Sequence, residues 1–164
     1  MTAGRTLTAL LLPLALLGAA APAARADHDF GLGVVVGEPT GATAEIVFGP
    51  KTSLDLALGV ELFHDRDLYF RLDFLFRLVE FHEGGLGIPL YLGIGAFIWD
   101  HDRNRDDDDV HFGPRVPFGV ALEFSSIPIQ FFAEIAFRLI LFDHGGGDEV
   151  DADLSAALGF RYYF

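Results

Sequence analysis

The sequence predicts an all-β chain in which eight antiparallel strands close into an up-and-down transmembrane barrel. Residues 151–164 alternate over their whole length: every even-numbered side chain is apolar, and Asp151, Asp153 and Arg161 stand on the other side. A transmembrane strand of about 9–11 residues with one lipid face looks like this, whereas a soluble strand averages about 5–6. Mean hydropathy is +0.37, yet no apolar run of the ~20 residues a spanning helix needs follows residue 26. Alternating barrel strands reconcile these two facts, because only half of each strand faces lipid.

The N-terminus has the organisation of a secretory signal peptide. Arg5 precedes an apolar run over 7–17, and small residues lead to Ala24-Arg25-Ala26. A basic start, a short apolar segment and an A-x-A site are the three parts of such a signal. A transmembrane anchor is the alternative, but the run is too short and prolines flank and interrupt it. We therefore predict a cleaved signal peptide over 1–26 and a barrel domain over 27–164.

Composition excludes several classes of protein. After cleavage the chain keeps 9 basic and all 24 acidic residues, a net charge of −15, so it does not bind nucleic acid by charge. It has no cysteine, which excludes disulfides and thiolate-bound metals. About 140 residues suffice for one small barrel and are too few for a second domain.

Eight segments of the mature chain carry the period of a strand. Their predicted ranges are 31–37, 41–48, 53–62, 68–78, 89–99, 115–124, 129–141 and 151–164. Pro117 stands inside the sixth segment, where a closed barrel offers proline no free edge, so we expect a bulge there or a later start. The connections alternate between short turns and longer acidic loops, as periplasmic turns and external loops do. The connection at 38–40 is an exception, since it is short although it falls on the external side.

Periodicity does not decide which face points outwards. A soluble lipocalin-like barrel would place the apolar side chains inside. We favour the membrane arrangement because the apolar face is bulky and nearly free of charge, while the other is rich in glycine and alanine, which suits a narrow interior. Aromatic residues also gather near strand ends, as interfacial girdles do. The predicted girdles are Phe48, Phe76, Phe124, Phe131, Tyr162 and Phe164 at one rim, and Phe63, Trp99, Phe112 and Phe142 at the other.

Two stretches carry a resemblance to a known class. Residues 31–41, Gly-Leu-Gly-Val-Val-Val-Gly-Glu-Pro-Thr-Gly, and the end of the chain at 157–164 resemble an uncharacterised family of small Gram-negative outer-membrane barrels, of the OmpX or OmpA-barrel type. The resemblance implies an outer-membrane location, contact with outer-membrane lipid, and recognition of the terminal aromatics Phe160, Tyr162 and Phe164 by the barrel-assembly machinery. We expect a monomer without a cofactor. The resemblance implies no activity.

Many charges fall on the face predicted to line the lumen. An eight-stranded barrel is only wide enough for its side chains to fill, so these charges must pair with one another. They could form a selectivity ring or a proton relay, but we favour a structural salt-bridge core that plugs the lumen. The predicted network is Glu45, Asp55, Glu61, Arg71, Asp73, Arg77, Arg115, Glu123, Glu134, Arg138, Asp153 and Arg161.

The acidic loop over 100–111 is the candidate cation site. Carboxylates suit Ca²⁺ or Mg²⁺, and histidine with aspartate suits Zn²⁺. The spacing matches no known site, so a solvated acidic rim is the simpler interpretation, and a surface that binds a partner is another. The candidate ligands are His101, Asp106, Asp107, Asp108, Asp109 and His111.

Catalysis has little support in the sequence. A lipid-modifying barrel hydrolase needs a serine and histidine pair reachable from the lipid face. The outward positions hold neither residue. We therefore expect a structural or surface barrel that is not an enzyme, with a narrow channel, a loop-binding protein and a barrel enzyme as alternatives.

Overall fold

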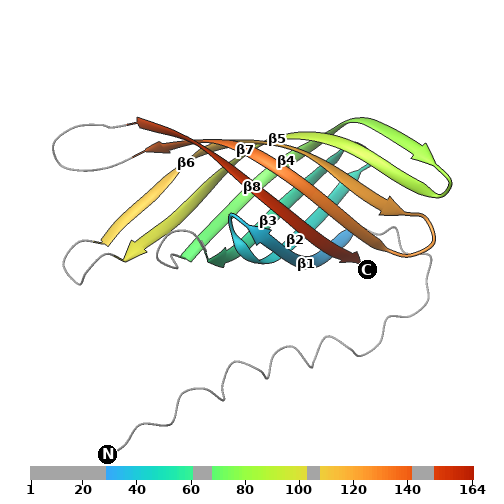
Figure 1. Cartoon of the computed structure of the whole chain (residues 1–164), viewed down its shortest axis with the longest axis horizontal. Coiled ribbons are helices and arrows are strands. Elements are labelled where there is room, and N and C mark those ends of the chain that lie inside the picture. The colour runs from blue at the N-terminus through green and yellow to red at the C-terminus, as the bar shows by residue number, and fades with distance from the viewer. Residues whose placement is uncertain (1–28, 61–67, 103–107, 142–149) are drawn as a thin grey trace, which may run out of the picture.

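The computed structural model describes residues 29–60, 68–102, 108–141 and 150–164, and these residues form eight β-strands without a helix (Figure 1). The strands are β1 (Phe30–Gly37), β2 (Thr40–Gly49), β3 (Thr52–Val60), β4 (Leu68–Glu83), β5 (Leu86–Asp102), β6 (Asp108–Phe124), β7 (Ile129–Leu141) and β8 (Val150–Tyr163). In the described part of the chain, no helix is long and apolar enough to cross a membrane. The predicted signal peptide, Glu61, Phe63 and Phe142 lie outside the described residues.

The strands follow one another around a closed barrel, and β8 pairs with β1. All neighbours are antiparallel, which confirms the predicted fold class. A path that starts at Gly31 on β1 and moves from each residue to its partner on the next strand arrives at Asp153 on β8. Across the closing pair of strands, however, Gly31 pairs with Tyr163. The register therefore steps by ten residues in one circuit, and such a stagger accompanies a strand tilt of roughly 35–45°.

Three strands are longer than their hydrophobic pattern predicts. β4 extends to Glu83 after a register shift between Arg77 and Val79. β5 and β6 extend outwards until Asp102 pairs with Asp108, so part of the predicted acidic loop is strand. In β4 the register shift breaks the alternation, and Val79 and Phe81 continue the apolar outward face beyond it. At the outer ends of β5 and β6, the backbone stays paired where polar side chains replace the apolar face. We call the end of the barrel at Asp102 and Asp108 the outer end, and the end at Phe164 the inner end.

The predicted disturbance at Pro117 is wrong. β6 runs through it in an unchanged register, and Pro117 pairs with Ala136 on β7. On the β5 side Gly93 makes room: a Cβ built there would lie 2.8 Å from Pro117 Cγ. The ring is buried inside the barrel, and the strand accommodates it without inserting a residue.

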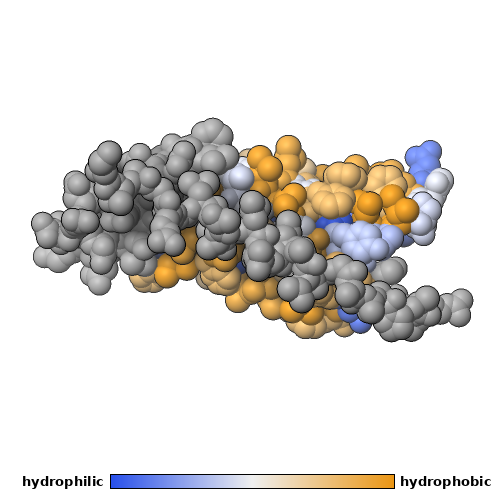
Figure 2. Space-filling view, turned by 90° about the horizontal axis from the view of Figure 1, so that it is seen from below, coloured by the Kyte–Doolittle hydropathy of each residue, from blue (hydrophilic) through white to orange (hydrophobic). Residues whose placement is uncertain are grey.

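The outer surface is apolar and the interior holds the charges. Large hydrophobic side chains such as Val34, Leu58, Ile94 and Ile135 are exposed, whereas Arg71, Asp73, Arg115 and Arg161 are buried. Hydrophobic colour dominates the described part of the face in Figure 2. This is the inverse of a soluble barrel, so the lipocalin-like arrangement is wrong for this chain.

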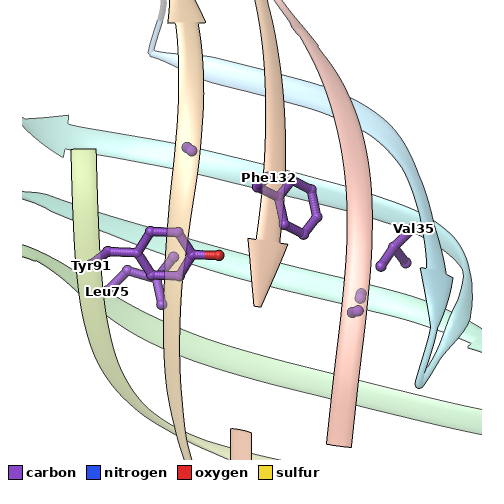
Figure 3. Close-up of a cluster of buried hydrophobic side chains, with 7 residues drawn as sticks. Val35, Leu75, Tyr91 and Phe132 are labelled. Carbon is purple, nitrogen blue, oxygen red and sulfur yellow. The ribbon is translucent and has the colours of Figure 1, made fainter. Parts of the chain in front are cut away.

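Two clusters of apolar side chains share the interior with the charges. One joins Val35, Leu75, Tyr91 and Phe132 with three alanines (Figure 3). The other contains Tyr69, Phe97 and Ile140, with Trp99 packed against it. Placing Trp99 in the outer aromatic girdle was therefore wrong, because it follows Phe97 by two residues and shares its inward face.

Candidate functional site: the charged lumen

Charged side chains follow one row of paired residues around the inside of the barrel. The row starts at the inner end on β2 and climbs to the outer end on β8, because the register steps by ten residues per circuit. Its charged members are Glu45, Asp55, Asp73, Arg115, Arg138 and Asp153. Three acids stand side by side and two arginines follow them. Like charges directly opposite each other are destabilising, so this row needs partners from other rows.

Glu134 on β7 is the centre of the most buried cluster. Its Oε1 accepts hydrogen bonds from Arg71 Nη1 and, at 2.7 Å, from Arg115 Nη2. Its Oε2 accepts one from Tyr91 Oη at 3.3 Å. Arg115 Nη1 also lies 3.0 Å from Asp73 Oδ2, and Arg71 Nη1 lies 3.5 Å from the same oxygen. Four charges from three strands, β4, β6 and β7, thus neutralise one another where water is excluded.

Arg161 on β8 neutralises the acids at the start of the row. Its Nη2 donates to Asp55, and its Nη1 lies 2.8 Å from Glu45 Oε2. The same Nη1 donates to Gln130 Oε1 at 3.0 Å, and Nη2 donates to Thr43 Oγ1 at 2.9 Å. A single guanidinium therefore joins side chains of β2, β3 and β7 to β8, which ties the last strand to the first part of the barrel.

The inner mouth holds a more exposed pair. Arg77 Nη2 and Nη1 donate to the two carboxylate oxygens of Glu123 at 2.7 and 3.1 Å, and Gln130 Nε2 donates to Glu123 Oε1 at 2.9 Å. The two charged side chains are 19% and 27% exposed. A pocket of about 260 Å³ opens beside them, below the turn that joins β6 to β7.

Arg138 on β7 occupies the outer part of the lumen. Its Nη2 donates to Glu38 Oε2 at 2.8 Å and to Asp153 Oδ2. Its Cζ lies 5.3–5.8 Å from the centroids of three stacked rings, those of Tyr69, Phe97 and Trp99. Cation–π attraction of this kind strengthens as the site is desolvated.

Large side chains fill the space between the clusters. The Phe132 ring lies 4.0 Å from Arg161 Cζ and fits over Gly159, where an added Cβ would come within 2.1 Å of the ring. A cavity of about 10 Å³ lies among side chains that include Glu45, Tyr91 and Arg161. That volume suits about one water molecule.

The structure brings the predicted lumen charges together, except Glu61, which lies outside the described residues. Several polar partners were missing from the predicted network. They are Glu38, Thr43, Tyr91, Gln130 and Tyr163, whose hydroxyl donates to Glu45. Four of them lie on inward positions of their strands, so alternation could have identified them. Glu38 could not be found in that way, because it belongs to a turn.

The candidate cation ligands stay a prediction. Asp106 and Asp107 lie outside the described residues, while His101 and Asp109 pair across β5 and β6, as Asp102 and Asp108 do. His111 packs its ring 5.1 Å from that of Trp99. Among the side chains that the structure describes, no group of three or more potential ligands gathers.

The terminal aromatics lie at the inner end of the barrel. The rings of Tyr162 and Phe164 contact each other edge to face at 5.0 Å, and Phe160 packs on Phe131 at 5.3 Å. Recognition of these residues by an assembly machinery also stays a prediction.

Comparison with known proteins supports the fold. No family model matches the chain, and no curated protein matches it. A solved structure does: the N-terminal β-barrel domain of Pseudomonas aeruginosa OprF, at 16% identity and a TM-score of 0.56, over 82% of this chain and 95% of that domain. At this identity the likeness shows the barrel fold alone.

Proposed function

We propose that this protein is a structural or surface barrel of the bacterial outer membrane, whose lumen is closed by paired charges. One observation carries the proposal: the described wall is apolar outside, and its buried charges contact charges of opposite sign inside. Lipid covers an apolar barrel wall, and every backbone group of a closed barrel can pair within it. The signal peptide predicted over 1–26 and the fold shared with the OprF domain support export to that membrane.

A closed lumen is favoured over an open channel. Arg71, Arg115 and Arg161 span the interior from different strands and contact acids on others. Eight strands leave room for side chains and little more. A steady aqueous path would require these contacts to separate, and a separated buried charge is costly.

A structural role is favoured over catalysis. Ser53 and Ser155 are buried inside the barrel, and Ser155 Oγ donates to a backbone oxygen, that of Ala136, at 3.5 Å. Neither faces lipid, where the acyl chain of a lipid substrate would lie. A nucleophile also needs a base within hydrogen-bond reach. Ser53 hydrogen-bonds the Glu45 carboxylate, but Arg161 already binds that carboxylate and the pair is buried in the lumen.

The proposal is tested on residues 27–164 refolded into detergent micelles and then into phosphatidylcholine vesicles. We expect a β-rich circular dichroism spectrum, a change of gel migration on boiling, and no steady conductance in planar bilayers. A detergent-independent soluble monomer would contradict the membrane location. A steady ion-selective current from the folded monomer would contradict the closed lumen.

A further inference from the structure

At the outer end of the barrel, β1 stops several residues short of the end of β8. The two strands are level at the inner end, where Phe164 N donates to Phe30 O at 2.9 Å. At the outer end their last ladder pair is Gly37 with Ala157, and Glu38 N donates to Ala156 O at 3.0 Å. The chain then turns into β2 at Thr40, whereas β8 extends outwards to Val150. Figure 1 shows β8 continuing past the hairpin between β1 and β2.

The hairpin is too short to cross the hydrocarbon layer. β1 has 8 residues and β5 has 17. At ~3.3 Å per residue and a tilt of about 40°, these strands rise by about 20 Å and about 43 Å along the barrel axis. The apolar band of an outer-membrane barrel is about 25 Å tall. Because the inner ends of β1 and β8 are level, the deficit of β1 falls on the outer side.

Beyond Ala156, the edge of β8 has no partner among the described residues of β1, and its own side chains cap part of it. The bond from Glu38 to Ala156 O shows that even-numbered residues of β8 direct their backbone groups towards β1. The N–H groups of Ala152 and Leu154 face the same way, and they donate to Asp151 Oδ1 at 2.8 Å and Asp153 Oδ1 at 2.7 Å. Leu154 is 70% exposed. Carboxylates at an edge block further strand pairing, but they satisfy no carbonyl oxygen.

The same place brings the lumen charges to the surface. Glu38 stands at the hairpin and Asp153 on β8, and Arg138 joins them from inside the barrel. The Glu38 and Asp153 side chains are 18% and 45% exposed. Partly exposed carboxylates and open backbone carbonyls are costly in hydrocarbon. Arg138 already binds both carboxylates, but the described residues of β1 offer no donor to the carbonyl oxygens of Ala152 and Leu154, which therefore require donors from outside the barrel wall.

We propose that outer-leaflet headgroups and water descend into this notch, which is bounded by the hairpin Gly37–Thr40 and by the edge of β8 over 150–156. The inference rests on the proposed membrane location. A barrel with one low side thins the bilayer there, because lipid adapts to a short apolar height at modest cost. Water and headgroups supply the missing donors. A second copy fits less well, since two barrels with the same orientation would present tilted β8 strands that cross instead of aligning antiparallel.

The absence of cysteine allows a direct test. Leu154→Cys and Val36→Cys place a thiol beside the notch, on β8 and on β1. Ile98→Cys is the matched control: like Leu154 it is an exposed outward side chain four residues from the outer end of its strand, but it lies on the tall β5. Each variant is reconstituted in phosphatidylcholine vesicles and treated with a membrane-impermeant maleimide. We expect the two notch thiols to react at least about tenfold faster than the control.

Three outcomes would count against the notch or the membrane location. Equally slow labelling of all three thiols would mean that lipid or chain seals the wall, and equally fast labelling in a barrel that still shifts on boiling would mean that no side is lower. Both results overturn the notch and leave the membrane location standing. Fast labelling without the gel shift and without vesicle association would instead overturn the membrane location itself.

Discussion

The central cluster around Glu134 and the pair at the inner mouth use the same chemistry in different surroundings. Glu134 receives two arginines and a tyrosine in a site that solvent does not reach. Glu123 receives one arginine and a glutamine at a mouth that remains partly open. An exposed pair is screened by water, whereas a buried charge that loses its partner cannot be rehydrated. The burial of a charged pair therefore determines its contribution to stability more than the number of its hydrogen bonds does.

The largest effect is expected for Glu134→Gln. The amide keeps the shape of the side chain but removes the charge, which leaves Arg71 and Arg115 with too few carboxylates. We expect a loss of about 3–5 kcal/mol in the free energy of unfolding, the usual result of breaking a buried pair. Urea unfolding of the folded barrel, followed by the fluorescence of Trp99, measures it. A loss below about 1 kcal/mol would mean that water reaches the cluster and that the lumen is not closed.

A smaller effect is expected where the interior is close-packed. Gly159→Ala would place a Cβ within 2.1 Å of the Phe132 ring, and overpacking of this kind costs about 1–3 kcal/mol. Gly49→Ala is the control, because nothing lies within 4 Å of a Cβ built at that position, near the turn that joins β2 to β3. Adding Phe132→Leu to Gly159→Ala should recover part of the loss in the same urea experiment. Equal stability of the two alanine variants would show that the lumen is looser than its contacts indicate.

The smallest effect is expected at the inner mouth. Glu123→Gln removes a pair whose side chains remain partly solvated, so the cost should be about 0.2–1 kcal/mol. The loss should shrink further at 1 M salt, because the Debye length falls to about 3 Å. Urea midpoints at low and high salt give both values. A loss as large as that of Glu134→Gln, and independent of salt, would remove the distinction between the two regions.

Alternation predicted the number of strands, their order and most of the inward charges. It succeeded because the side chains of a strand point to opposite faces in turn, so a strand between two chemically different media shows both in its sequence. It failed at the outer ends of β5 and β6, where the backbone remains paired after the apolar pattern has ended, and at the end of β4, where a register shift changes the phase of the pattern. It also failed at Trp99, because an aromatic residue near a strand end suits both a membrane interface and a lumen.

The sequence by itself determined that this chain is a barrel of alternating strands, because the medium on each face selects the residue type at every second position. Tertiary structure alone decided which charges meet. Arg161 contacts Asp55 and Glu134 contacts Arg71 across more than sixty residues of chain, and only the register of ten residues per circuit brings them together. The notch beside β8 is likewise a difference in height between β1 and β8, strands at opposite ends of the sequence. It exists only because closure of the barrel makes them neighbours.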